Sequence, residues 1–303
     1  MSRKALVTGS AGFVGQHLAQ HLIDQGWEVE GFNLRNGQNL LDYEYVRNAL
    51  DILRPDAIFH LAAQAYVPES FANPHRTFEV NTIGSLNILE AVRQLGIKTK
   101  IHLAGTSEEY GDAQYGDGII TEEALPNPLS PYAISKLAMD HLGRLYAKSY
   151  GLQVVVTRAF NHAGPGRGEM YAESAFAKQI VEIELGKREV VEHGNLESIR
   201  NYTDVRDIVR AYALAIDLPV GVYNICSNQS VTMQEIMDML IKHSKVPIET
   251  KVNPALYRPA DFSFKTPSCE KFKKLTGWEP KYKLEKTMAD VLDTWREKLG
   301  ANT

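Results

Sequence analysis

The sequence has few cysteines, no surplus of basic residues and no long apolar run. Only Cys226 and Cys269 are cysteines among 303 residues, which excludes a disulfide scaffold and a cysteine-rich zinc site and is typical of a reducing compartment. Asp and Glu number 37 against 33 Lys and Arg, whereas nucleic-acid binders usually carry a basic stripe. No segment reaches the roughly 18 apolar residues that a membrane-spanning helix needs. We therefore expect a cytoplasmic protein that binds neither nucleic acid nor membranes.

Short apolar segments alternate with helical patterns through the first 160 residues. Between segments that end at glycine or polar residues, apolar side chains recur at helical spacing, as at Val14, Leu18 and Leu22. Repeated β-α units with short connections predict an α/β protein with a Rossmann-type, doubly wound parallel sheet. The predicted strands are 5–7, 29–32, 57–61, 101–104 and 152–157.

A glycine-rich turn joins the first predicted strand to the first predicted helix. Gly9, Gly12 and Gly15 permit a tight turn and close approach of a pyrophosphate, and the helix N-terminus offers free N–H groups. Phe13 and Val14 lie in the same turn. In this strand–turn–helix context the pattern predicts a dinucleotide cofactor.

The end of the second predicted strand indicates which cofactor is preferred. An NAD site often has Asp or Glu there to bind the ribose diol, but here the strand is followed by Asn33 and Arg35. Arg35 can hold a 2′-phosphate, so NADP(H) is favoured and NAD(H) is the alternative. The competing interpretation is that Arg35 is a solvated loop residue.

The alternating pattern ends after Phe160, where Gly164-Pro165-Gly166 follows. We expect a dinucleotide-binding domain at 1–160 and a smaller, mainly substrate-binding α/β lobe at 161–303. Segments near 203–226 are expected to return to the first domain. The mixed charges of residues 203–212 predict a solvated or interdomain face.

The pattern Tyr-x-x-x-Lys occurs twice, at Tyr132/Lys136 and at Tyr282/Lys286. Ser130-Pro131, which are typical of a helix start, directly precede only the first of these pairs, Tyr132/Lys136. The same pair also comes after a predicted strand that ends near Thr106. Residues four apart share one face of a helix, so we expect the Lys136 ammonium to lower the pKa of Tyr132 toward a catalytic range.

Further motifs accompany these residues: 60–64 (HLAAQ), Asn81 and 276–280 (TGWEP). With them, the chain resembles the extended branch of the short-chain dehydrogenase/reductase superfamily over essentially its whole length. Residues 106–111 (TSEEYG) and 160–162 (FNH) resemble enzymes acting on GDP-mannose derivatives. Residues 194–197 (GNLE), Arg200 and 203–207 (TDVRD) are similar to GDP-4-keto-6-deoxy-mannose reductases.

This resemblance implies reduction of the C4 keto group of a GDP-4-keto-6-deoxy-hexose by NAD(P)H, giving a GDP-6-deoxy-hexose such as GDP-rhamnose. Tyr132 would protonate the C4 oxygen, Lys136 would bind the nicotinamide ribose, and Thr106 would orient the keto oxygen. The implied substrate-binding residues are Ser107, Asn161, Arg200 and Arg258, with the arginines on the diphosphate and nucleotide. The implied cofactor-binding residues beyond the glycine turn are Asn33, Arg35, Asn39, Leu40, Leu61, Ala62, Ala63, Tyr132, Lys136, His162 and Arg167.

Glu108 leaves the reaction open. In related 4,6-dehydratases a glutamate at this position is the base on C5, and reductases can carry it too, so Glu108 is included among the catalytic candidates. The alternatives are therefore a GDP-mannose 4,6-dehydratase or another nucleotide-sugar 4-epimerase or dehydratase, and a non-catalytic dinucleotide-binding regulator. No metal is expected, because His17 and His21 have the spacing of metal ligands but no third ligand and are expected to face solvent.

The resemblance also implies a homodimer that assembles through the helices near 81–92 and 131–149. Their apolar stripes are equally consistent with ordinary core packing.

Overall fold

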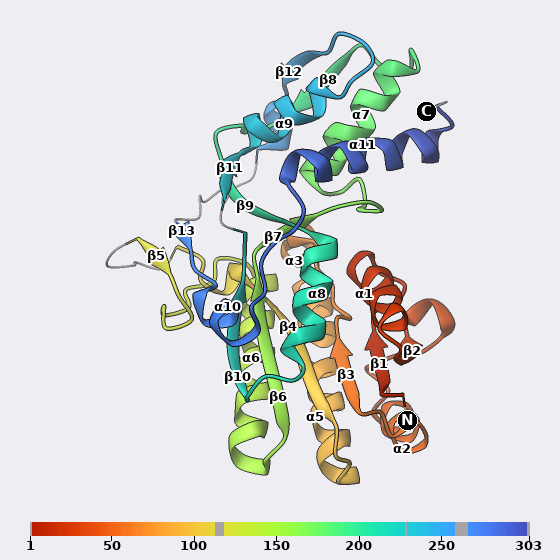
Figure 1. The fold of residues 1–303 in the computed structure, drawn as a ribbon, viewed down its shortest axis with the longest axis vertical. Helices are drawn as coiled ribbons and strands as arrows, with labels where there is room; N and C mark the ends of the chain where they lie inside the picture. Colours follow the sequence, from red (N-terminus) through yellow and green to blue (C-terminus); the bar gives the residue numbers. More distant parts are fainter. Residues whose placement is uncertain (1, 113–117, 228, 258–265, 302–303) are drawn as a thin grey trace.

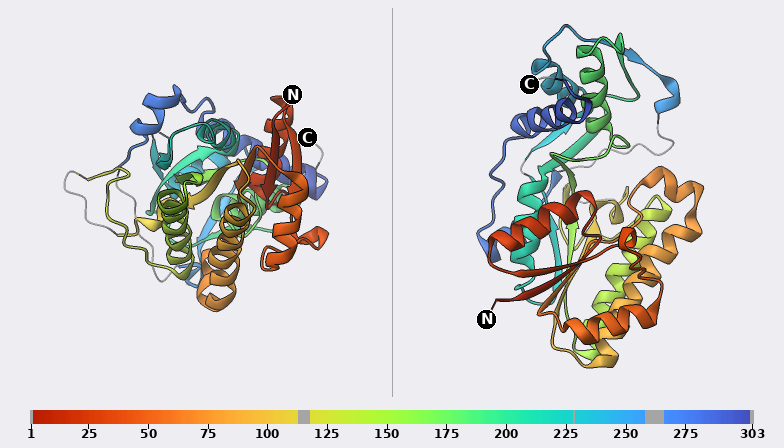
Figure 2. Two further views of the ribbon diagram at one scale, coloured as in Figure 1. Left: turned by 90° about the horizontal axis from the view of Figure 1, so that it is seen from below. Right: turned by 90° about the vertical axis from the view of Figure 1, so that its right-hand side faces the viewer.

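The larger of two lobes is built around a parallel sheet, and the smaller lobe lies beyond the carboxyl ends of its strands (Figures 1 and 2). This computed structural model describes residues 2–112, 118–227, 229–257 and 266–301. Six of the described strands form the sheet in the order β10-β6-β4-β3-β1-β2, all neighbours being parallel. They are β1 (Lys4–Thr8), β2 (Glu28–Phe32), β3 (Ala57–His60), β4 (Lys100–Thr106), β6 (Gln153–Ala159) and β10 (Gly221–Ile225).

Helices cover both faces of this sheet, as the view from below in Figure 2 shows. Alternate strand residues face opposite layers, so Ala5 and Val7 pack in one core cluster and Leu6 in the other. One layer contains α1 (Phe13–Asp24), α8 (Val205–Ala215) and α10 (Glu270–Thr276), and the other contains α2 (Tyr43–Leu53), α5 (Gly84–Leu95) and α6 (Pro131–Tyr150). The predicted doubly wound α/β fold is thereby confirmed. The packing of α10 on the sheet is a return that the sequence pattern did not indicate.

Short elements complete the larger lobe. A π-helical turn, η2 (Glu79–Ile83), precedes α5, so the α-helix expected near 81–92 begins only after this wider turn. The others are η1 (Leu34–Asn36), α3 (Val67–Ala72), α4 (Pro74–Phe78), η3 (Ser107–Glu109) and β5 (Ile119–Ile120), which pairs with β13 (Thr266–Pro267).

The smaller lobe has its own core, in which three helices pack against short strands (Figure 1). Phe176, Ile180, Leu240 and Trp295 are among its buried side chains. Its strands are β7 (Asn161–Ala163), β9 (Ile199–Asp204) and β11 (Ser230–Thr232) in one sheet, and β8 (Val190–His193) with β12 (Glu249–Val252) in another. Its helical elements are α7 (Ala172–Glu184), α9 (Met233–Lys242), η4 (Pro254–Leu256) and α11 (Leu284–Leu299).

The charged segment 203–212 joins the two lobes. Asp204 and Asp207 are only 2% and 0% exposed, so the solvated interpretation of this segment is wrong. Asp204 accepts hydrogen bonds from the Arg206 backbone N–H (2.8 Å) and from the Thr287 hydroxyl of α11 (2.7 Å). Burial is tolerated because these carboxylates are paired and hydrogen-bonded.

None of the helices in the described ranges is long and apolar enough to cross a membrane.

Candidate active site

The predicted site residues come together at the carboxyl edge of the central sheet, which faces the smaller lobe (Figure 1). The glycine turn follows β1, residues 61–63 follow β3, Thr106 ends β4, and Asn161 follows β6. The strand order changes direction at β1, because β2 lies on one side of it and β3 on the other. Ligands of open α/β sheets bind at such a switch point.

The glycine turn leaves room only for backbone. Gly9 has a φ of +69°, and a Cβ there would lie 2.9 Å from backbone atoms of Ala62. A Cβ on Gly15 would lie 2.2 Å from the Gly9 carbonyl oxygen. Gly12 precedes α1 without a capping side chain, so no cap side chain occupies the N–H groups of the first helical turn. This cradle fits the pyrophosphate of a dinucleotide.

Asn33 connects the end of β2 to the glycine turn. Its side-chain nitrogen donates to the Ser10 hydroxyl (3.3 Å), and its side-chain oxygen caps η1 by accepting from the Asn36 N–H (3.2 Å). Arg35 is exposed on η1. Asn39 uses its side-chain oxygen to accept from the Leu41 N–H (3.0 Å), and Leu40 is buried.

A chain of buried polar groups connects the glycine turn to α6. The Thr8 hydroxyl contacts Nδ1 of His60 (2.8 Å), Nε2 of His60 contacts the Ser85 hydroxyl (2.8 Å), and Ser85 donates to the Asn81 carbonyl (2.5 Å). Asn81 then donates to the Ser135 hydroxyl (2.9 Å). Burial lowers the pKa of His60 to about 3, so its imidazole is neutral. These hydrogen bonds hold the π-helical turn η2 against α6, the helix that carries Tyr132 and Lys136.

Lys136 is held beside the end of β4. The Ser130 side chain accepts from the Ala133 N–H (3.1 Å) and starts α6 at Pro131. One turn later, Nζ of Lys136 donates to the Ala104 carbonyl at 2.8 Å. Burial lowers the pKa of Lys136 to about 8.

Tyr132 lies at the start of the same helix, where it is partly buried. Burial and then the Glu108 charge raise the pKa of Tyr132 above its ordinary value, while a hydrogen bond with the Thr106 side chain acts in the opposite direction. The structure does not show the expected lowering of this pKa by Lys136, because desolvation of the phenolate dominates. The phenol is protonated at neutral pH.

Residues from β7 and the loop after it face the glycine turn. The rings of Phe13 and His162 stack with centroids 6.3 Å apart, and the Arg167 guanidinium lies 5.1 Å above the Phe13 ring and 2.7 Å from Glu173. Burial lowers the pKa of His162 to about 4. The side-chain oxygen of Asn161 is buried and has no hydrogen-bond partner within the described part of the chain. Buried polar groups of this kind need a partner, so this atom is suited to a bound ligand.

The remaining predicted residues are divided between the lobes. Ser107 is buried in η3, whereas Arg200 lies on β9 of the smaller lobe and donates to the Ile199 carbonyl (2.9 Å). Arg258 lies outside the described residues. The second Tyr-x-x-x-Lys match is separate from the site: Arg206 stacks on the Tyr282 ring at 3.8 Å, and Lys286 pairs with Asp290.

The prediction that His17 faces solvent is wrong. His17 is partly buried, and its Nε2 hydrogen-bonds with the Pro165 carbonyl at 2.8 Å. The bond joins α1 to the turn that leads into the smaller lobe, a contact that helical periodicity does not encode.

Sequence analysis missed Tyr171 and Tyr66. Tyr171 precedes α7 in the smaller lobe, where the Arg167 guanidinium lies 3.8 Å above its ring, and its ring centroid is 6.3 Å from that of Tyr66. A negative charge on the Tyr171 phenolate would raise the pKa of Tyr132. No local sequence pattern predicts the position of Tyr171, because the packing of the two lobes brings this residue near Tyr132.

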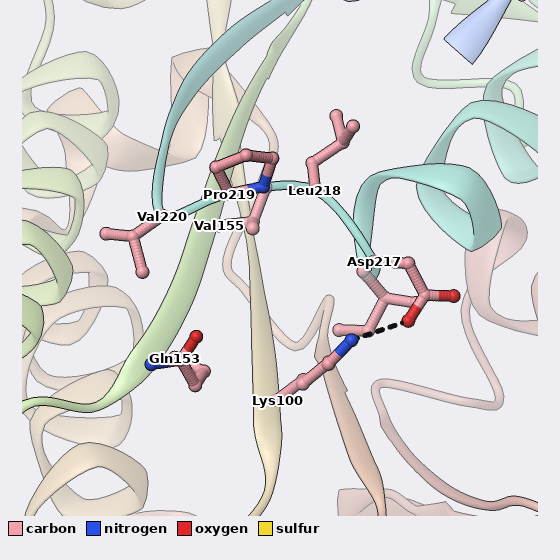
Figure 3. A pocket seen from close by; sticks show the side chains of 8 residues that line it. Lys100, Gln153, Val155, Asp217, Leu218, Pro219 and Val220 are labelled. Carbon is pink, nitrogen blue, oxygen red and sulfur yellow. Dashed lines mark hydrogen bonds and ion pairs between the residues drawn. The ribbon is translucent and has the colours of Figure 1, made fainter. Parts of the chain in front are cut away.

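A cavity of about 300 Å³ lies at the opposite, amino-terminal edge of the sheet (Figure 3). Lys100, Gln153 and Asp217 are among its lining residues, and Lys100 pairs with Asp217 at 2.7 Å. This cavity is remote from Thr106 and Tyr132, since Lys100 and Thr106 begin and end the same strand.

The chain matches known proteins over nearly its whole length. Residues 6–291 match the sequence model of a family described as GDP-mannose 4,6 dehydratase. The chain is 32% identical over 302 residues to a GDP-6-deoxy-D-mannose reductase of Pseudomonas aeruginosa, covering 99% of each. It is 28% identical to a GDP-mannose 4,6-dehydratase of Yersinia enterocolitica, covering 96% of this chain and 93% of that protein.

Solved structures show the same similarity. RMD from Pseudomonas aeruginosa complexed with NADPH superposes with a TM-score of 0.89 at 30% identity, covering 98% of this chain and 100% of that one. The UDP-glucose 4-epimerase of Thermus thermophilus in complex with NAD superposes with a TM-score of 0.86 at 32% identity, covering 99% and 100%.

Proposed function

Because this chain belongs to the GDP-mannose 4,6 dehydratase family, we propose that it reduces the C4 keto group of a GDP-4-keto-6-deoxy-hexose with NAD(P)H. The product is a GDP-6-deoxy-hexose such as GDP-rhamnose. The observation that carries this proposal is the identity of 32% with a GDP-6-deoxy-D-mannose reductase over 99% of both chains. NADPH is the favoured reductant, since the similar RMD structure holds NADPH and Arg35 stands at the end of β2. NADH is the alternative, since the similar epimerase holds NAD.

Tyr132 is the proposed proton donor. When bound, the nicotinamide supplies the hydride for C4. The Tyr132 hydroxyl gives its proton to the C4 oxygen, so that the carbonyl becomes an alcohol. The raised pKa of Tyr132 supports this direction of transfer, because the phenol is protonated before the reaction. The Thr106 hydroxyl orients the same oxygen.

The other proposed roles concern binding. The Lys136 amine, directed by its bond to Ala104, holds the nicotinamide ribose. The unpaired oxygen of Asn161 accepts a hydrogen bond from the sugar. Arg200, together with Arg258, binds the diphosphate and nucleotide, to which guanidinium groups are suited.

Dehydration of GDP-mannose is the second candidate, and Glu108 is the observation that favours it. The charge of Glu108 acts on both Tyr132 and Tyr171, so this carboxylate lies where it can take a proton from a sugar bound beside Tyr132. With C4 oxidised to a ketone by a bound NAD(P)+, a base at this position would remove the C5 proton while the C6 hydroxyl leaves as water, and the hydride taken from C4 would return to C6.

The decisive experiment supplies candidate substrates separately. Purified protein is incubated with GDP-mannose alone, with UDP-glucose alone, and with the GDP-4-keto-6-deoxy sugar plus NADPH or NADH. We expect cofactor oxidation only with the keto sugar. Turnover of GDP-mannose without added reductant would assign the dehydratase instead, and C4 epimerisation of UDP-glucose would assign an epimerase.

Tyr132→Phe tests the proton donor. We expect kcat to fall by about 10²- to 10⁴-fold, the usual contribution of general acid catalysis, with little change in NADPH affinity measured by fluorescence titration. Tyr282→Phe is the matched control, because Tyr282 has the same motif spacing but stacks on Arg206 away from the site. Wild-type activity in Tyr132→Phe would rule out Tyr132 as donor.

We also propose a homodimer. Ile83 on η2 and Ile134 and Leu145 on α6 are 46%, 45% and 52% exposed. Ile134 and Leu145 are eleven positions apart, which places them on one face of the helix. An apolar stripe of this kind on paired helices suits a second copy of the chain.

The proposed cytoplasmic setting rests on the cysteines. Cys226 and Cys269 are both buried and form no disulfide in the described part of the chain, and the Cys269 thiol contacts the Cys226 carbonyl at 3.2 Å. A reducing compartment keeps thiols in this state.

A further inference from the structure

A buried carboxyl group lies directly beneath the turn that carries Thr106. Glu109 is 0% exposed. Its Oε1 accepts from the Thr106 backbone N–H at 2.9 Å, and its Oε2 accepts from Nε of Arg158 at 2.9 Å. A Cβ on Gly105 would lie 2.6 Å from Oε1, so the preceding glycine leaves the space that the carboxyl occupies.

Arg158 extends this contact to the catalytic helix. It lies on β6, and it donates to Oδ2 of Asp140 from Nη2 at 2.7 Å and from Nε at 3.0 Å. Asp140 follows Tyr132 by eight positions and Lys136 by four, so these three side chains share one face of α6. Glu109, Arg158 and Asp140 thus connect the end of β4, strand β6 and helix α6.

We propose that Glu109 is a positioning residue for the reduction: it fixes Thr106 and, through Arg158 and Asp140, the separation between Thr106 and Tyr132. The proposal rests on the roles assigned above to these two residues. Glu109 itself is enclosed below the turn and acts through the Thr106 backbone.

The cluster is costly to bury but well connected. One buried arginine faces two buried carboxyl groups, and taking charges out of water is costly even when they are paired. Replacing a whole buried ion pair or triad with apolar side chains is often neutral or stabilising, whereas removing a single partner is destabilising. Glu109 also completes a capping box with Thr106 on η3, so its carboxyl ties the Thr106 backbone to this turn.

Three substitutions separate positioning from packing. Glu109→Gln keeps an oxygen acceptor for the Thr106 N–H, Glu109→Leu removes it, and Glu109→Asp keeps the carboxyl group but shortens its reach. We expect kcat for the keto sugar to fall by about 10²-fold in Glu109→Leu, the scale of a misplacement of about 1 Å, and also to fall in Glu109→Asp. Glu109→Gln should remain close to wild type, and KM for NADPH should change little in all three.

Glu184 provides a matched control. It is also a buried carboxylate that pairs with an arginine, Arg296 (2.6 Å), and accepts a backbone N–H, from Lys245 (2.9 Å), but it lies at the end of α7 in the smaller lobe. Glu184→Leu should lower the melting temperature and leave kcat unchanged. Glu109→Leu should also lower the melting temperature, because it leaves the buried Thr106 N–H without its acceptor, but of the two variants it alone should lower kcat.

Amide hydrogen exchange tests the same contact without substrate. Exchange in a peptide covering residues 100–112 should accelerate in Glu109→Leu and stay near wild type in Glu109→Gln. Unchanged exchange in Glu109→Leu, wild-type kcat in that variant, or equal losses in Glu109→Leu and Glu109→Gln would overturn the positioning role. If Glu109→Leu does not fold, equal kcat in Glu109→Asp and wild type would overturn it. Failure of the wild type to reduce any keto sugar, with exchange as expected, would contradict only the proposed reaction.

Discussion

Single residues determine how closely ligands can approach the backbone in this site. Gly9 and Gly15 face backbone atoms at distances that exclude a side chain. At the other end of the site, Lys136 and Tyr132 are held by the neighbouring strand and the helix start. The glycine turn thus depends on the absence of side chains, whereas the region around Tyr132 and Lys136 depends on polar groups held in place by hydrogen bonds.

Gly15→Ala should disrupt cofactor binding. Its Cβ would lie 2.2 Å from the Gly9 carbonyl oxygen, so the turn must shift away from the geometry that holds a pyrophosphate. We expect the NADPH dissociation constant, measured by fluorescence titration, to rise at least about tenfold, equivalent to about 1.4 kcal/mol. Gly168→Ala, where an added Cβ meets no atom within 4 Å, is the control. Equal affinity in the two variants would contradict this account of the turn.

At the scale of elements, β3 and β4 place histidines inside the sheet. His60 lies in the polar chain described above, and Nε2 of His102 contacts the Thr157 hydroxyl of β6 at 2.8 Å. Burial, and secondarily the Lys136 charge, lower the pKa of each histidine to about 3. The central strands therefore contain imidazoles that stay neutral while the protein is folded.

Acid should destabilise the sheet through these histidines. Between about pH 6.5 and 3, an unfolded histidine binds a proton that the folded protein excludes, so the free energy of unfolding falls as pH falls. In urea unfolding from pH 6.5 to 4.5, His102→Gln should show a shallower decline than wild type, by up to about 1.4 kcal/mol per pH unit. His75→Gln, at an exposed position, should match the wild-type slope. A His102→Gln slope equal to wild type would mean that this histidine is protonated in the folded protein.

Helices and strands marked by neighbouring residues, such as caps and apolar periodicity, could be predicted from the sequence. Contacts between elements far apart in the sequence could not. Ser130, Pro131 and the apolar spacing predicted α6, and apolar runs predicted the strands, because helix caps and burial periodicity are local properties. Glu109 and Arg158 are 49 positions apart, and Tyr171 comes from the other lobe. Their meeting depends on strand order and lobe packing, which no local window contains.

At the scale of the whole molecule, the two lobes are interleaved. The chain enters the smaller lobe after β6, returns through α8 and β10, leaves again to β11, returns at α10 and ends in the smaller lobe with α11 (Figure 1). Trp278, after α10, is buried in the core of the larger lobe and donates to the Asp207 carbonyl (3.1 Å). These crossings connect the two lobes at several points along the chain.

Ile134→Glu should weaken the proposed dimer. A charge in the middle of the apolar stripe would be buried without a partner in the assembly, so sedimentation velocity should show a shift toward monomer. Ile52→Glu, on α2 with the side chain 82% exposed, is the control and should sediment as wild type. If Ile134→Glu sediments as the wild-type dimer does, another surface forms the interface.

The position of β10 at the edge of the sheet has a consequence for truncated forms of the chain. β10 pairs along β6 from Val155 to Ala159, yet it comes more than sixty positions later. A fragment ending near residue 160 would leave the backbone of β6, with its three consecutive valines at 154–156, as an uncovered edge. Such edges pair with one another and aggregate. We expect a ribosome-bound chain to expose this edge until β10 has emerged, so self-association through β6 should be most favoured over that interval.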